Sequence, residues 1–130
     1  MSASRPVRIE EPALLFTINQ MFREGMSALA LYEATRGFWR VGPDREKAEL
    51  ALAVYQGVVR EVYRIDRWDP AGTQEYETRE VGANRGSGRW EFTGEVAADM
   101  RGKYVGRFVD KGGQNPIHYA NVKPAAGRKS

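Results

Sequence analysis

The feature of this sequence that most restricts its fold is a succession of short β-type runs in its second half. We predict strands at residues 51–55, 58–65, 76–81, 89–96, 104–109 and 117–122. Turn residues such as Gln56 and Gly57 separate these runs, as in hairpins. Small proteins built from many short, mostly antiparallel strands commonly close into a barrel, because closure removes exposed strand edges. The sequence therefore favours a small barrel.

Helical segments are predicted mainly ahead of those strands. Residues 12–24 carry apolar side chains at helical spacing, with Pro12 in the first turn. Residues 28–36 follow Ser27, which is a favourable N-cap. Single helical turns are also predicted at 44–50 and 97–102, and further short strands at 7–10 and 38–41. We expect an α+β fold in which two or three short helices flank a mostly antiparallel barrel.

The length of 130 residues corresponds to about one domain. We expect a flexible leader at residues 1–7, a single domain at 8–122 and a basic tail at 123–130. The sequence has no apolar run of about 18 residues and no apolar signal segment near its start, so no membrane span is predicted. A cytoplasmic location is the default expectation.

Few residues in this sequence are suited to catalysis or metal binding. The chain has no Cys and a single His, His118, which excludes disulfides, thiolate sites and multi-histidine metal sites. No serine has the setting of a hydrolase nucleophile, and the glycine-rich segments do not match a phosphate-binding loop. We therefore expect no metal, no cofactor and no enzymatic activity. The alternative is a small enzyme that acts on a nucleotide or nucleobase through an acidic loop containing Glu75, Glu77 and Glu80.

The net charge of +3 is unevenly distributed along the chain. Residues 66–99 contain four arginines and eight acidic residues, whereas residues 100–130 contain seven basic residues and one acid, Asp110. A basic segment of this kind favours a polyanionic partner. The alternative is a solvated basic tail.

Tryptophans lie close to arginines at the boundaries of predicted elements. Trp39 lies between Arg36 and Arg40 at the exit of a predicted helix, and Trp68 lies just past a predicted strand. Aromatic rings beside arginines suit a protein that stacks a flipped or single-stranded base and holds its phosphates. Core packing is the alternative for each tryptophan, and it is the preferred reading for Trp90.

Four runs in the first half of the chain resemble the first half of YTH and EVE domains. They are SALALY at 27–32, FWRVG at 38–42, ALAVYQGV at 51–58 and VYRI at 62–65. Residues 89–96 and 111–117 are similar to the second half of those domains. The chain also resembles the SRA-like reader domains of McrA-type modification-dependent restriction endonucleases. The resemblance covers residues 8–122 and implies a PUA-like barrel that reads a base through an aromatic cage.

The resemblance implies a set of base-binding residues. Trp39 matches the first cage tryptophan, Trp68 is the candidate for the second wall, and Tyr76 is its rival. The other candidates for the cage and for polar contacts to the base are Tyr55, Tyr32, Asp69 and Asn115. The candidates for phosphate contacts are Arg36, Arg40, Lys103, Arg107 and Lys111.

The function that follows from the resemblance is a non-catalytic module that recognises a modified, flipped base in DNA. Such a module would serve as the reader of a restriction or defence system, in which a partner chain would have to supply cleavage. The alternative within the same fold is a module that binds modified or structured RNA.

Overall fold

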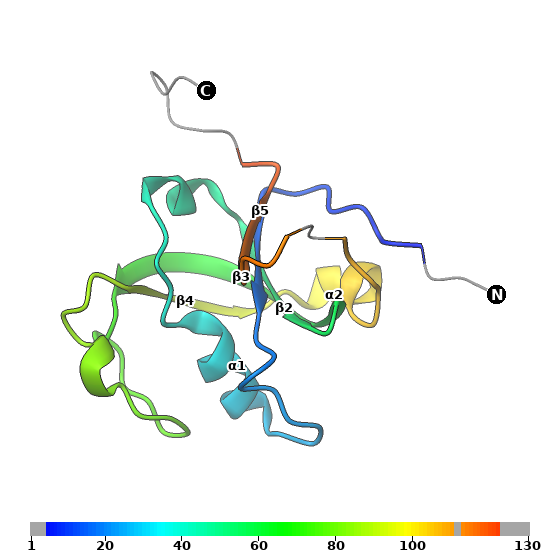
Figure 1. Ribbon diagram of the computed structural model, residues 1–130. Helices are drawn as coiled ribbons and strands as arrows, with labels where there is room; N and C mark the ends of the chain where they lie inside the picture. The colour runs from blue at the N-terminus through cyan, green and yellow to red at the C-terminus, as the bar shows by residue number, and fades with distance from the viewer. Residues whose placement is uncertain (1–4, 111–112, 123–130) are drawn as a thin grey trace.

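A computed structural model describes residues 5–110 and 113–122 of the chain. It contains five strands and two α-helices (Figure 1). In chain order these are β1 (Ala13–Thr17), α1 (Ala28–Arg36), β2 (Leu50–Tyr55), β3 (Val58–Pro70), β4 (Trp90–Val96), α2 (Ala98–Tyr104) and β5 (Ile117–Ala120). Short 3-10 helices lie at Pro43–Lys47 and Gly82–Asn84.

The five strands form one mixed sheet in the order β4-β3-β2-β1-β5. β1 and β2 are parallel, whereas the other neighbouring pairs are antiparallel. The predicted α+β class is confirmed. The sheet is not closed into a barrel, because β4 and β5 are its two edges.

The helix predicted at residues 12–24 is wrong, because its first part is the strand β1. β1 lies between β2 and β5 in the sheet, and core side chains pack on both of its faces. Leu14 and Phe16 pack into one core cluster, and Ala13 and Leu15 pack into the other. A strand buried on both faces has a continuous apolar run, which periodicity cannot distinguish from a buried helix.

Several other predicted elements are confirmed. α1 covers the predicted residues 28–36, and the Ser27 side chain caps it by accepting a hydrogen bond from the amide of Ala30. β2 and β4 agree with their predictions to within one residue. The turn at Gln56 and Gly57 has positive φ at both residues, as a tight two-residue hairpin requires.

Other boundaries differ from the predictions. β3 continues to Pro70, five residues beyond its predicted end, so Trp68 lies inside the strand. Residues 76–81 form a loop instead of a strand. Tyr104 ends α2, and residues 105–109 form a strand-like contact only at the bridge between Val58 and Phe108.

The helices lie on opposite sides of the sheet (Figure 1). Tyr104 of α2 packs into the cluster that contains Leu52, Val59 and Val62. On the other side, Tyr32 of α1 packs against the cluster that contains Phe16, Tyr63 and Phe92. The chain leaving α1 then pairs with the edge strand β4, which brings Trp39 to the rim of the sheet. Within the described residues, no helix has the length and apolar character needed to cross a membrane.

Candidate nucleic-acid interface at Trp39

Trp39 is held in place by three contacts. Its backbone forms a two-way bridge with Trp90, with N···O distances of 2.9 and 2.8 Å. Its ring stacks on Phe16, with 4.5 Å between centroids and 18° between planes. Its indole Nε1 donates to the carbonyl of Thr35 at 2.8 Å. The ring is therefore fixed against the core and remains only half-buried.

Two grooves meet at Trp39. The first, here called the α1 groove, has a volume of about 470 Å³ and is lined by residues 17–21, Ala34, Gly37, Arg79 and Gln114. The second, here called the β5 groove, has a volume of about 490 Å³ and is lined by Arg40, Arg89, Asn115, Ile117 and Tyr119. Phe38, Trp39 and Pro116 line both grooves. Both volumes are in the range of small-ligand sites.

The charged side chains that line these grooves are all arginines. Arg79 lines the α1 groove, and Arg40 and Arg89 line the β5 groove. None of the described residues that line either groove is Asp or Glu. Outside the grooves, the Arg45 guanidinium lies 3.5 Å from the ring centroid of Trp90 and pairs with Glu46 at 3.5 Å. An anionic ligand with aromatic parts therefore meets complementary charge here.

The three groove arginines differ in how firmly they are held. Arg79 donates to the carbonyls of Glu33 and Gly37, and it lies 4.4 Å from the ring centroid of Phe38. Burial lowers the pKa of the Arg79 guanidinium. Arg89 donates to the Asn84 side chain at 3.2 Å. Arg40 is exposed and has no ion pair or hydrogen bond from its side chain to another described residue.

Trp68 does not reach the grooves. It lies inside β3 with only 8% of its surface exposed. Its ring meets Phe92 edge-on at 5.4 Å and Phe16 at 6.4 Å between centroids. The structure therefore places Trp68 in the core beneath Trp39 instead of opposite it, as the core-packing alternative expects.

A separate cluster lies at α1. It consists of Tyr32 and Arg36 of the helix and Tyr76 of the loop after β3. The Arg36 guanidinium lies 5.0 Å from the ring centroid of Tyr32 and 4.3 Å from that of Tyr76. It also donates to the carbonyl of Glu75 at 2.7 Å. The Tyr32 hydroxyl accepts from the amide of Gly94. These side chains hold a loop on the body of the protein and do not line the Trp39 grooves.

Two buried carboxylates hold the same loop. Glu91 accepts hydrogen bonds from the amides of Gly72 and Gln74 and from the Tyr76 hydroxyl, at 3.0, 2.6 and 2.8 Å. Glu33 accepts from the amide and hydroxyl of Thr78 and from the next amide upstream. Arg79 directly follows Thr78, so Glu33 helps to determine where that cation lies, whereas Arg89 is held by the hydrogen bond from the amide of Ala71 to its carbonyl.

The pKa of the Glu33 carboxyl reflects two opposing effects, burial and hydrogen bonding. Burial by itself would raise this pKa, but hydrogen bonds from the Thr78 side chain and from the amides of Glu77 and Thr78 outweigh burial and lower it. Among the described residues, no group of three acidic or histidine side chains is arranged to hold a metal ion.

The remaining base-contact candidates lie apart from Trp39 or serve local structure. Tyr55 packs on Phe22 in a tilted arrangement with 4.6 Å between ring centroids, near the hairpin of β2 and β3. Asp69 pairs with Arg67 at 3.0 Å. Asn115 does line the β5 groove, and its Oδ1 accepts from the amide of Ile117 in a turn.

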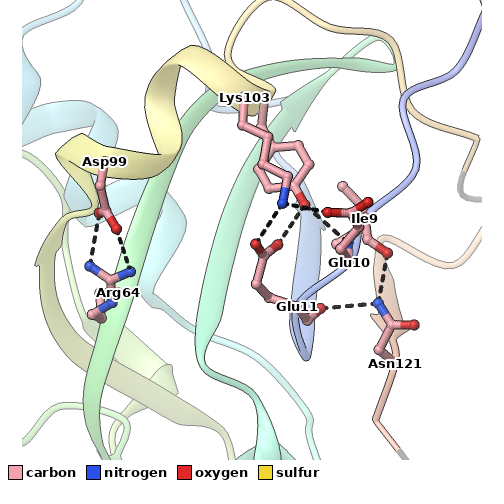
Figure 2. A network of polar contacts seen from close by, with 8 residues as sticks. Ile9, Glu10, Glu11, Arg64, Asp99, Lys103 and Asn121 are labelled. Atoms are coloured by element: carbon pink, nitrogen blue, oxygen red, sulfur yellow. Dashed lines mark hydrogen bonds and ion pairs between the residues drawn. The ribbon is translucent and has the colours of Figure 1, made fainter.

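The predicted phosphate contacts near α2 are also separate from the grooves. Lys103 pairs with Glu10 at 2.7 Å and with Glu11 at 2.9 Å (Figure 2). Arg107 is exposed three residues after the end of α2, where its carbonyl accepts from the amide of Val59. Lys111 lies outside the described residues. Of the four phosphate candidates that the structure describes, only Arg40 lines a groove at Trp39.

The sequence did not identify Arg79, Arg89 or Gln114 as site residues. Arg79 and Arg89 come from the segment with an excess of acidic residues, which hid them as candidate cations. Gln114 precedes Asn115, which did carry a prediction.

No protein-family model, curated protein or solved structure matches the chain.

Proposed function

We propose that this protein is a non-catalytic module that binds nucleic acid and holds a modified, extruded base of DNA beside Trp39. The observation that carries the proposal is the pair of grooves at Trp39. They combine aromatic walls with Arg40, Arg79 and Arg89 and have no carboxylate among their described lining residues. Base-stacking proteins use this combination of aromatic rings and cations.

The energetics of such a site are consistent with base extrusion. Extrusion costs a few kcal/mol of unstacking, and stacking on an aromatic ring returns about 1–3 kcal/mol per base. Ion pairs with phosphates supply the rest, so the affinity must fall as salt rises. Phe16 covers one face of Trp39, so a base uses the edge and the remaining surface of that ring.

The PUA-like barrel belongs to the same proposal. Two contacts support it by bringing the N-terminal segment between β5 and the segment after α2. The amide of Val7 donates to the carbonyl of Phe108 at 2.7 Å, and the Asn121 side chain donates to the carbonyl of Ile9 at 2.7 Å. The N-terminal segment therefore partly occupies the open side of the sheet next to the edge strand β5, where a closed barrel would continue its strand pairing.

The experiment is an anisotropy titration with labelled DNA and RNA oligonucleotides, plain and base-modified, single- and double-stranded. We expect the highest affinity for a modified DNA. A preference for RNA would move the proposal to the RNA alternative, and no binding to any oligonucleotide would overturn it.

A matched pair of charge reversals locates the site. Arg40→Glu and Arg107→Glu change the net charge equally, and both side chains are exposed. We expect Arg40→Glu to weaken binding at least tenfold, because it places a carboxylate in the β5 groove, and Arg107→Glu to have a much smaller effect. Equal losses would show that only overall charge matters, and a larger loss in Arg107→Glu would place binding near α2.

A further inference from the structure

We infer that the two grooves at Trp39 have different tasks: the α1 groove reads the edge of a base, and the β5 groove holds the adjoining phosphate. This inference rests on the proposed function. It starts from the difference between two cavities of similar size that share Phe38, Trp39 and Pro116. A nucleotide has the same two kinds of part, a flat base with a polar edge and a charged phosphate.

The α1 groove has the properties of a base pocket. Ile18 and Ala34 are nearly fully buried in its wall, with 3% and 2% of their surfaces exposed. Its polar groups are mostly amides, from Asn19, Gln20 and Gln114. Amide side chains present a donor and an acceptor side by side, which is how proteins read the edges of bases.

The cation of the α1 groove is poorly placed for a phosphate. Arg79 already donates to the carbonyls of Glu33 and Gly37 and lies over the Phe38 ring. These contacts use part of its hydrogen-bonding capacity and fix its orientation. Arg79 therefore contributes more to the shape of the groove than to a flexible ion pair.

The turn that carries Gln20 is also fixed. The Asn19 Oδ1 accepts from the amide of Gln56 at 3.0 Å, which ties this turn to the hairpin of β2 and β3. The neighbouring Gln20 is exposed, as is Gln114 across the groove. The amide of Gln20 is therefore available on a fixed turn, which a selective contact needs, and the amide of Gln114 is exposed in the same groove.

The β5 groove has the properties of a phosphate site. Arg40 and Arg89 both line it, and the exposed Arg40 has no ion pair with another described residue. A guanidinium in this state offers several donors to a phosphate without first breaking an internal contact. Because the two grooves share a wall, one strand of nucleic acid can place a base in the α1 groove and the next phosphate in the β5 groove.

The test uses three single substitutions at exposed positions. Affinities of wild type, Gln114→Ala and Arg40→Gln are measured for oligonucleotides that differ in one base, the best and the worst binders of the panel. Each titration is repeated between about 50 and about 200 mM salt. Thermal unfolding of each variant checks that the fold is kept, and Gln20→Ala provides a second probe of the α1 groove.

We expect Gln114→Ala or Gln20→Ala to reduce the ratio between best and worst binder by about tenfold and to leave the salt slope unchanged. Arg40→Gln is expected to keep the ratio and to reduce the salt slope by about one. If the amide variants leave the ratio unchanged, or if Arg40→Gln changes the ratio instead of the slope, the division of tasks is wrong while the proposed function stands. If wild type binds no oligonucleotide, both proposals fail.

Discussion

The face that carries Trp39 and the face that carries α2 both display basic side chains, but the two faces differ in the acids that lie beside those side chains. Near α2, Lys103 pairs with Glu10 and Glu11, and Arg101 pairs with Glu61 at 2.9 Å. Arg64 and Asp99 form a further pair on this side (Figure 2). Around Trp39 the described groove residues include no carboxylate at all. Lys103 and Arg101 therefore serve the fold, whereas Arg40 beside Trp39 can serve a ligand.

This difference shows why charge along a sequence is a poor guide to a binding face. The most basic segment, residues 100–130, places Lys103 and Arg101 against acids from distant parts of the chain. The acidic segment 66–99 supplies Arg79 and Arg89 to the grooves. Ion pairing in three dimensions determines which charges a partner meets.

The largest expected effect is a loss of stability when the loop after β3 loses its buried acceptor, Glu91. Glu91 is fully buried, and Glu91→Ala would leave the amides of Gly72 and Gln74 and the Tyr76 hydroxyl without their acceptor. We expect the free energy of unfolding to fall by about 3 kcal/mol or more, measured by urea denaturation. The exposed Glu95→Ala on the same strand is the control, and an equally small change in both variants would contradict the role of Glu91.

The next effect concerns Trp39 itself. Trp39→Ala removes the stack on Phe16 and the hydrogen bond to the Thr35 carbonyl. We expect it to lower the free energy of unfolding by about 2 kcal/mol and to abolish oligonucleotide binding. Trp39→Phe keeps an aromatic ring and should lose only about 1 kcal/mol. Retained affinity in the folded Trp39→Ala variant would exclude Trp39 as the stacking ring.

A smaller effect tests the α2 face through pH. Burial by itself would raise the pKa of Glu11, but hydrogen bonds from Tyr104 and Lys103 outweigh burial and lower it below its ordinary value of 4.5. The charged form therefore stabilises the fold at neutral pH, and this stabilisation is lost as the pH falls through the lowered pKa.

Glu11→Gln is the matching variant. We expect it to reduce the free energy of unfolding by about 1 kcal/mol at neutral pH, with the difference from wild type shrinking as the pH falls below about 4. Urea denaturation across this pH range measures the difference. The control is Glu10→Gln, whose carboxylate is 63% exposed. A difference from wild type that grows in acid would contradict this assignment.

The smallest effect is expected at the exposed pair of Arg64 and Asp99. The two side chains are 48% and 60% exposed, so solvent screens the charges. Arg64→Ala should leave both the midpoint of thermal unfolding and oligonucleotide affinity close to wild type. A clear loss of affinity would mean that the α2 face also contacts the ligand, which would break the contrast between the two faces.

Local signals in the sequence predicted part of the fold well. α1 follows from Ser27 and the apolar spacing after it, and the hairpin of β2 and β3 follows from Gln56 and Gly57. β1 was missed because its neighbours bury it on both faces, and that depends on a parallel pairing with β2 across more than thirty residues. Local sequence carries no record of such a pairing.

The site was predictable only in part for the same reason. Trp39, Arg40 and Asn115 were identified from their sequence context and lie together at the β5 groove. Trp68 was misplaced because the end of β3 was set too early. The position of Arg79 depends on a buried carboxylate that holds a loop, and that of Arg89 depends on backbone pairing with Ala71, neither of which a local pattern reveals.

The most direct test of the central claim is a nitrogen–proton correlation NMR spectrum recorded while the best oligonucleotide is added. The chain has three tryptophans, and each indole gives one resonance that a Trp→Phe variant assigns. We predict that the Trp39 indole resonance shifts strongly, because the ligand lies against that ring, while the resonance of the buried Trp68 changes much less. An unchanged Trp39 resonance under saturating ligand, with shifts confined to α2, would contradict the account.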